Sequence, residues 1–230
     1  MAGRQRQLDL NLSTWGGRRT GAGRKPRDLK AGVSHQRRPE LSKNTITHVT
    51  LRVHRAVASL RTKERVRALR KCLASAGTKS GFRVAHYSVQ GSHMHLVVEA
   101  DSRAALASGM NGLGTWMARR LNAIAGRRGR VFVDRYHARM LKTPREVRFV
   151  LAYVLLNWPR HLAQHGNRLR VPQPDPCSSG PLFDGWQESP TVAPTPEERA
   201  CIVNPHGWML RVGWRRYGCI SLSEVPGSSI

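Results

Sequence analysis

Two histidines separated by one residue, His93 and His95, stand in a run of otherwise mostly apolar residues. Side chains two apart on a β-strand share a face, so both imidazoles are expected to point one way while Met94, Leu96 and Val98 point the other. Imidazole nitrogens bind metals, and two of them side by side over a buried layer predict a metal site. Two solvated histidines on a half-exposed strand are the ordinary alternative.

Tyr153 and Asn157 follow about sixty residues later, spaced as neighbours on one face of a helix. A tyrosine phenol can attack a phosphodiester, hold the phosphate covalently and leave again when the reaction reverses. A divalent cation held by His93, His95 and the side-chain oxygen of Asn157 would polarise that phosphate, and this mixed ligand set suits Mg²⁺ or Mn²⁺. A core tyrosine whose hydroxyl is hydrogen-bonded is the alternative for Tyr153 taken alone.

The helix expected to carry this tyrosine has the clearest start signal in the chain. Thr143 is a candidate N-cap, Pro144 suits the first helical position, and Glu146 completes a capping box. The helix should run from Pro144 toward residue 161, and Pro159 should end or kink it.

Hydrophobic periodicity predicts the remaining elements. The expected strands span residues 45–53, 82–89, 94–100 and 131–141, and the expected helices span residues 62–76 and 102–125. The order strand, helix, two strands, helix, strand, helix predicts an α+β sandwich in which helices cover one face of an antiparallel sheet. The other face would be left for a ligand.

The charge of the chain indicates the class of its partner. There are 39 Lys and Arg against 14 Asp and Glu, a formal net charge of +25. Such an excess calls for a polyanion, and nucleic acid is the leading candidate. The charge does not distinguish an enzyme from a basic binding protein.

Three regions are expected along the chain. Residues 1–44 contain 11 Lys and Arg against three acids and predict a disordered basic arm that adds affinity for DNA. Residues 45–165 form the domain, and residues 166–230 read as a Pro- and Ser-rich linker with a short aromatic and basic tail, 208–217, that packs back on the core or contacts nucleic acid. The arm's candidate DNA contacts are Arg18, Arg19, Arg24 and Lys25.

Cysteine usage and hydropathy favour the cytoplasm. The four cysteines form no Cys-x-x-Cys pair, which argues against a zinc ribbon and offers no clear disulfide framework. The longest uncharged apolar stretch, residues 149–159, is too short to span a bilayer, and the basic N-terminus is not followed by an apolar signal segment. We therefore expect neither membrane insertion nor secretion.

Taken together, these residues resemble the HUH single-tyrosine transposases, in particular the REP-associated tyrosine transposases and related bacterial insertion-sequence transposases. The resemblance covers about residues 45–165. The matching segments are His93-Met94-His95, the strand Arg135-Tyr136-His137-Ala138-Arg139 before the catalytic helix, and Tyr153 to Asn157. Two positions depart from the family pattern: Ser92 stands where Asn often precedes the first histidine, and Trp158 separates Asn157 from Pro159.

The resemblance implies a ferredoxin-like fold and cleavage of single-stranded DNA, commonly a hairpin. Cleavage would give a 5′-phosphotyrosine on Tyr153 and a free 3′ hydroxyl, and the strand would then be rejoined to another. Arg135 and Arg139 would stabilise charge on the phosphate. Gln90 and Glu99 are alternative oxygen donors to the metal, and a solvated charge at the strand end is the ordinary alternative for Glu99. The implied location is a bacterial cytoplasm, at the nucleoid.

Two other functions remain open at this point. One is a domesticated, non-cleaving binder of single-stranded DNA or RNA that keeps the fold. The other is a metal-dependent hydrolase that uses water, which would form no covalent adduct. Part of the family dimerises, and no residue decides between a monomer and a homodimer here.

Overall fold

The computed structural model describes residues 33, 36–76, 80–158, 172–191 and 193–225. The elements of the main domain, in chain order, are β1 (Thr45–Arg52), α1 (Lys63–Ala76), β2 (Phe82–Val89), β3 (His93–Ala100), α2 (Arg103–Ile124), β4 (His137–Leu141) and α3 (Pro144–Leu155). They are followed by η1 (Gly180–Leu182), α5 (Pro196–Arg199), α6 (Trp208–Arg211) and η2 (Gly213–Tyr217).

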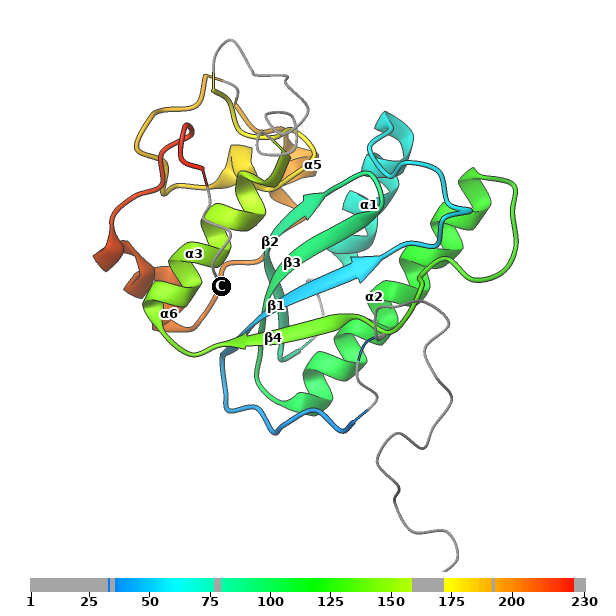
Figure 1. Ribbon diagram of the computed structural model, residues 1–230, viewed down its shortest axis with the longest axis horizontal. Coiled ribbons are helices and arrows are strands. Elements are labelled where there is room, and N and C mark those ends of the chain that lie inside the picture. Colours follow the sequence, from blue (N-terminus) through cyan, green and yellow to red (C-terminus); the bar gives the residue numbers. More distant parts are fainter. Residues whose placement is uncertain (1–32, 34–35, 77–79, 159–171, 192, 226–230) are drawn as a thin grey trace, which may run out of the picture. The chain divides into compact units, whose positions relative to one another are not determined.

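The four strands form one antiparallel sheet in the order β2-β3-β1-β4 (Figure 1). Together with the element order βαββαβ, this is the ferredoxin-like arrangement. The predicted α+β class is therefore confirmed. β1 and β3 are the central strands, so the residues of β3 that face either side of the sheet lie over its middle.

The two faces of the sheet are covered by different helices. α1 and α2 pack on one face, where Met94 and Leu96 of β3 join their core. α3 packs on the opposite face, against Ile46 of β1 and Val97 of β3. α3 thus departs from the expectation of helices on one face only, because its apolar stripe needs an apolar partner and the sheet residues next to the histidines provide one.

Two elements are shorter than the sequence predicts. The capping box of Thr143 and Glu146 is present at the start of α3, and the helix ends at Leu155. Asn157 and Trp158 are helical again after a break at Leu156, and the predicted continuation from residue 159 to residue 161 lies outside the described residues. The predicted strand at 131–141 forms a regular ladder only from His137, and Phe132 makes a single bridge to Val53.

The segment expected as a linker and tail packs on the domain in its described part, residues 172–191 and 193–225. Phe183, Trp186, Leu210 and Trp214 are buried in the same cluster as the apolar face of α3. Aromatic side chains bury large apolar areas, which gives this irregular segment a reason to dock.

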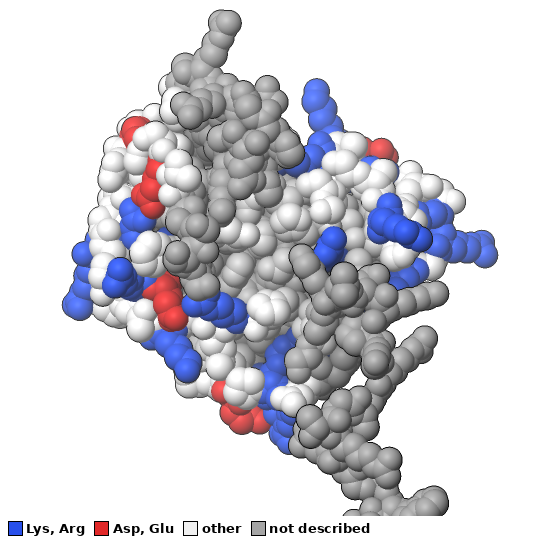
Figure 2. Space-filling view, in the orientation of Figure 1, with Lys and Arg blue, Asp and Glu red and all other residues white. Residues whose placement is uncertain are grey.

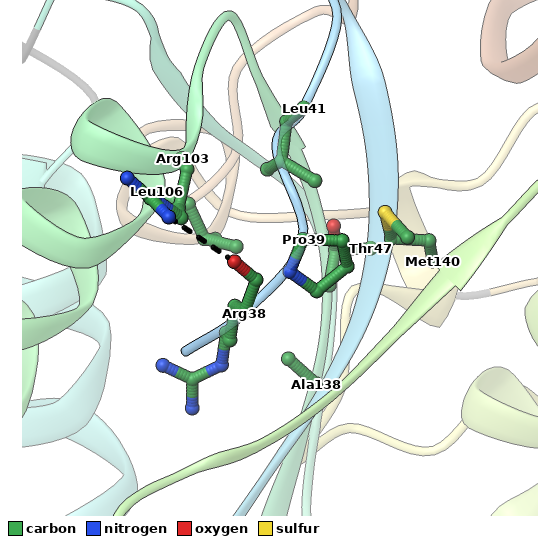
Figure 3. Close-up of a pocket in the computed structure, with 8 residues that line it drawn as sticks. All are labelled: Arg38, Pro39, Leu41, Thr47, Arg103, Leu106, Ala138 and Met140. Carbon is green, nitrogen blue, oxygen red and sulfur yellow. Dashed lines mark hydrogen bonds between the residues drawn. The ribbon is translucent and has the colours of Figure 1, made fainter. Parts of the chain in front are cut away.

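A small pocket of about 70 Å³ lies between residues 38–41, α2 and the sheet (Figure 3). Thr47 of β1 and Met140 of β4 line it, so it belongs to the face of the sheet opposite His48 and Arg139. Arg103 donates a hydrogen bond to the carbonyl of Arg38 across it at 3.3 Å. The pocket is therefore separate from the histidines and forms part of the packing beside α2.

Within the part of the chain that the structure describes, no helix combines the length and the apolar character needed to cross a membrane.

Gly109 is expected to be required by packing although it lies inside α2. A Cβ at this position would stand 2.2 Å from the ring of Phe82, which is 1% exposed. Gly109→Ala should therefore lower the free energy of unfolding by about 1–3 kcal/mol, despite the better helix propensity of alanine. Urea unfolding followed by circular dichroism measures this.

Gly114 provides the matched control on the same helix. A Cβ at this position would meet only Phe132, at an ordinary 3.9 Å. Gly114→Ala should therefore be neutral or stabilising by up to about 1 kcal/mol. Equal effects of the two substitutions would contradict the packing argument.

Candidate active site

The register of the sheet sets which side chains lie beside the two histidines. Thr50 of β1 is directly opposite His95, and Arg52 is directly opposite His93. Directly paired residues of antiparallel strands share a face, so all four side chains lie on the face that carries α3. His95 is buried and His93 is partly buried, and their rings lie edge to face with centroids 4.8 Å apart.

A third histidine, His48, completes the cluster, and sequence reasoning missed it. Nε2 of His48 lies 3.1 Å from Nδ1 of His95, and Oγ1 of Thr50 lies 3.2 Å from the same nitrogen. These contacts at Nδ1 orient the His95 ring, as hydrogen-bond partners do for metal-binding histidines. The two-residue spacing of His48, Thr50 and Arg52 predicts that they share one face of the expected strand. Their position beside His95 depends on the pairing of β1 with β3, which the local sequence does not specify.

Burial keeps His48 neutral. It lowers the pKa of His48 from 6.5 to about 4, and electrostatic interactions with the nearby His137 and Arg139 act in the same direction. A neutral imidazole can accept a hydrogen bond from Nδ1–H of His95, and that tautomer of His95 presents Nε2 as its lone-pair nitrogen.

Tyr153 lies on α3 directly over this cluster. Its ring centroid is 5.2 Å from that of His95 and 5.9 Å from that of His48, in edge-to-face arrangements. The apolar neighbours Val150 and Val154 are fully buried and hold the helix on the sheet, whereas Tyr153 is partly exposed. The structure thus brings the predicted nucleophile and His95 together.

Asn157 lies two residues beyond the end of α3, not on its last turn. Its side chain is 2% exposed, and none of the described residues donates a hydrogen bond to its Oδ1. A buried amide oxygen without a donor is costly unless it meets another positive group, such as a cation.

The residue after Asn157 is clamped in place. The guanidinium of Arg61 lies 3.6 Å from the ring centroid of Trp158. Arg61 itself donates two hydrogen bonds to the buried carboxylate of Asp175, at 2.8 and 2.7 Å, and one to the carbonyl of Val89 at 2.8 Å. The departure from the family pattern at Trp158 therefore has a packing role next to the proposed ligand.

The two alternative oxygen donors differ in their settings. Gln90 shares a strand face with Ser88, which is directly opposite His95. Its hydrogen bond to Oγ of Ser88, at 2.7 Å, uses the amide nitrogen Nε2 and leaves Oε1 as a candidate donor. Glu99 shares the histidine face but is fully buried, six residues along β3 from His93, in an ion pair with Arg83. It is neither a solvated charge nor within reach of the histidines, because six strand residues span about 20 Å.

The cations predicted to bind DNA differ in their settings. Arg139 is opposite His48 on the site face, and Glu146 lies 3.5 Å from it. Arg135 precedes β4 and donates to the carbonyl of Gln36 at 3.4 Å. Arg52, exposed beside His93, is a further cation on this face that sequence reasoning missed. The arm residues Arg18, Arg19, Arg24 and Lys25 lie outside the described residues.

Charge is unevenly spread around the site. In Figure 2, Lys and Arg gather toward the α2 side and the α6 side of the visible face, and the area between them is mainly uncharged.

Among the described residues, no cluster of three or more His, Cys, Asp or Glu is arranged to hold a metal. A metal bound by His93 and His95 would need an oxygen donor as well, and the Oδ1 of Asn157 is the predicted one; it is buried and accepts no hydrogen bond from the described residues.

Comparison with known families identifies the domain. A family model described as "Transposase IS200 like" matches residues 42–155, about half of the chain, which include the sheet, the histidines and Tyr153. The chain thus belongs to the IS200-like transposases through this domain. The predicted family is confirmed.

Two solved structures resemble the chain in part. One is a REP-associated tyrosine transposase bound to a REP hairpin, with 16% identity over 58% of this chain and 75% of that chain, and a TM-score of 0.45. The other is a candidate transposase from Deinococcus radiodurans R1, with 14% identity over 61% of this chain and all of that chain, and a TM-score of 0.37. The comparison with curated proteins gives no match.

Proposed function

We propose that this protein is a tyrosine transposase that cleaves and rejoins single-stranded hairpin DNA through a 5′-phosphotyrosine intermediate. The observation that carries the proposal is the position of Tyr153, partly exposed and 5.2 Å from His95 between ring centroids, within the segment that matches the family. A phenol placed over a group of imidazoles and cations is suited to attack a phosphate held there.

The reaction balances without a further reactant. The phenolic oxygen of Tyr153 attacks the scissile phosphorus and loses its proton to solvent, while the bond from phosphorus to the 3′ oxygen breaks. That oxygen takes up a proton and becomes a 3′ hydroxyl. In rejoining, the 3′ hydroxyl of another strand attacks the phosphotyrosine and the phenol is released, so the number of phosphodiester bonds is conserved.

Each side chain of the site has a role in this scheme. His93, His95 and the Oδ1 of Asn157 would hold Mg²⁺ or Mn²⁺, which when bound supplies charge stabilisation at the phosphate. His48 and Thr50 orient His95 through Nδ1. Arg52 and Arg139 would contact phosphate oxygens, and Arg135 and the basic arm would add affinity for DNA.

The polarity of the covalent adduct tests the proposal. Single-stranded hairpins from the regions that flank the gene are labelled at either the 5′ or the 3′ end and incubated with the full chain and Mn²⁺. The 3′-labelled DNA should migrate with the protein on a denaturing gel, whereas the 5′-labelled DNA should be released as a shorter strand with a free 3′ hydroxyl. EDTA should abolish both products.

Other results would assign another function. Cleavage without any protein-linked DNA would point to metal-activated water. If the protein binds the hairpins but cleaves none of them, the result would favour the non-catalytic binder. An adduct on the 5′-labelled strand alone would contradict the proposed direction of attack.

His48→Gln is expected to weaken metal binding without removing a ligand. The substitution takes away the imidazole that contacts Nδ1 of His95, and loss of such a partner costs about 10–100-fold in metal affinity. Titration of Mn²⁺ into the protein, followed by calorimetry or by the electron paramagnetic resonance of free Mn²⁺, measures this without DNA.

The control for this prediction is His54→Gln, which changes a histidine beyond the end of β1. His54 accepts a hydrogen bond from the backbone of Ala56 and contributes nothing to the cluster. The affinity of the His54→Gln variant for Mn²⁺ should match that of the unchanged protein. Equal affinity in His48→Gln would remove the orienting role from His48.

A further inference from the structure

The short helices α6 and η2 near the end of the chain bury one side and expose the other. Leu210 and Trp214 are buried against α3, whereas Trp208, Val212 and Tyr217 are 49%, 51% and 50% exposed. Half-exposed aromatic side chains on so short a segment are unusual for a surface with no partner. We call Trp208, Arg211, Val212, Arg216 and Tyr217 the α6–η2 platform.

Trp208 is held so that its ring forms part of the surface. The guanidinium carbon of Arg216 lies 4.8 Å from the ring centroid of Trp208. Gly213 also allows the ring to lie close to the backbone, since a Cβ there would stand 2.7 Å from a ring carbon, and the ring is still 49% exposed. The indole is therefore fixed in place, which lowers the entropy cost of stacking a ligand on it.

The platform keeps its positive charge. Arg215 is paired with Asp184 at 2.7 Å, but within the described segments no salt bridge joins Arg211 or Arg216 to a carboxylate. Both side chains are exposed. A protein-docking surface is usually depleted of charge at its centre, whereas alternating aromatic rings and arginines are typical of surfaces that bind single-stranded nucleic acid.

A hollow adjoins the platform. It has a volume of about 650 Å³ and lies between β2 and the C-terminal segment. Its lining includes Asn204, His206, Arg211 and Val212, together with Asp184, whose charge is paired with Arg215. Its volume falls in the range of roughly 300–1,000 Å³ that small-ligand sites occupy. Amide, imidazole and guanidinium groups can hydrogen-bond a base or a phosphate, so the hollow could receive a nucleotide next to the stacking surface.

From these observations we infer that the α6–η2 platform binds single-stranded nucleotides that flank the hairpin. The inference rests on the proposed function for the identity of the DNA. Both α6 and η2 pack on α3. Arg148 of α3 also forms an ion pair with Glu224, which follows η2 in the chain. α3 spans only about 18 Å, so roughly five nucleotides would reach from the site of Tyr153 to the platform.

Affinity for flanked and unflanked hairpins tests the inference. Fluorescence anisotropy is measured in a Tyr153→Phe background, with a hairpin that carries single-stranded flanks of about ten nucleotides and with the same hairpin blunt. Trp208→Ala should weaken binding of the flanked DNA by about 5- to 100-fold, as expected for loss of one stacked base, and should leave the blunt hairpin as before. Arg216→Ala should weaken the same DNA and reduce the salt dependence of its binding.

Trp116→Ala is the matched control, because Trp116 is 39% exposed on α2. It should not discriminate between the two hairpins. Equal loss on both hairpins in Trp208→Ala, or no loss on either, overturns the inference. Tighter binding of the matching RNA strand, with the same loss in Trp208→Ala, would assign the platform to RNA and also overturn it.

The inference and the proposed function fail in different ways. Adduct formation by the unchanged protein tests the chemistry, and the difference between flanked and blunt hairpins tests the platform. An adduct without a Trp208 effect would refute the platform alone. A Trp208 effect specific to flanked DNA, without any adduct, would support the platform and refute the transposase chemistry.

Discussion

Tyr153→Phe is expected to abolish the covalent protein–DNA adduct and to lower strand cleavage by about 10⁴-fold or more. The substitution removes only the phenolic oxygen, so the ring contacts with His95 and His48 and the fold of α3 are kept. Removing the nucleophile of an enzyme that acts by covalent catalysis costs nearly the whole rate enhancement. Quantification of adduct on denaturing gels, together with DNA affinity by anisotropy, measures both effects.

Affinity for DNA should be nearly unchanged in this variant, because the cations that contact phosphates are retained. Tyr136→Phe is the matched control. Tyr136 packs in the core on the opposite face of the sheet, and its hydroxyl has no hydrogen-bond partner among the described residues. The Tyr136→Phe variant should form the covalent adduct at the same rate as the unchanged protein. Full activity in Tyr153→Phe would exclude Tyr153 as the nucleophile.

The parts of the fold that follow from local sequence were predictable. The β-branched alternation of β1, the apolar spacing of α1 and the capping box of α3 each depend on residues within one turn or one strand. The placement of His93 and His95 on one face followed from the two-residue period of β3. These are properties that neighbouring residues determine by themselves.

The remaining features depend on contacts between distant segments. His48 belongs to the site because β1 pairs with β3 in a particular register, which no local pattern specifies. α3 ends at Leu155, and Trp158 just beyond it is stacked on Arg61, which is itself fixed by Asp175. The sequence predicted that Pro159 would end or kink the helix. The contacts that hold Trp158 come from Arg61 and Asp175, which are distant in the sequence, so no local pattern could reveal them.

The docking of the C-terminal segment was predicted only for residues 208–217, and there only as one of two alternatives. Its many prolines and serines are typical of a linker, yet its aromatic residues bury themselves beside α3. The free energy gained by burying these aromatic side chains outweighs the preference of prolines and serines for exposed turns. Aromatic density in residues 183–217 was the available signal.

Glu99 connects that segment to the sheet through a buried charge. Its carboxylate accepts hydrogen bonds from Nε of Arg83 at 2.7 Å and from the backbone N–H groups of His206 and Gly207 at 2.8 and 2.6 Å. Its side chain is fully buried and that of Arg83 is 7% exposed. A buried carboxylate is tolerated only when its oxygens are satisfied in this way.

Glu99→Ala is therefore expected to lower the free energy of unfolding by about 3–5 kcal/mol, because it leaves the buried Arg83 with Asp101 as its remaining acid and two backbone donors without an acceptor. Urea unfolding measures the loss, and limited proteolysis should cut the segment around His206 sooner than in the unchanged protein. Glu197→Ala removes an ion pair of similar charge that is 69% and 41% exposed, and should cost at most about 1 kcal/mol. If both substitutions cost the same, the carboxylate of Glu99 is not what ties the C-terminal segment to β3, and apolar burial against α3 must do so alone.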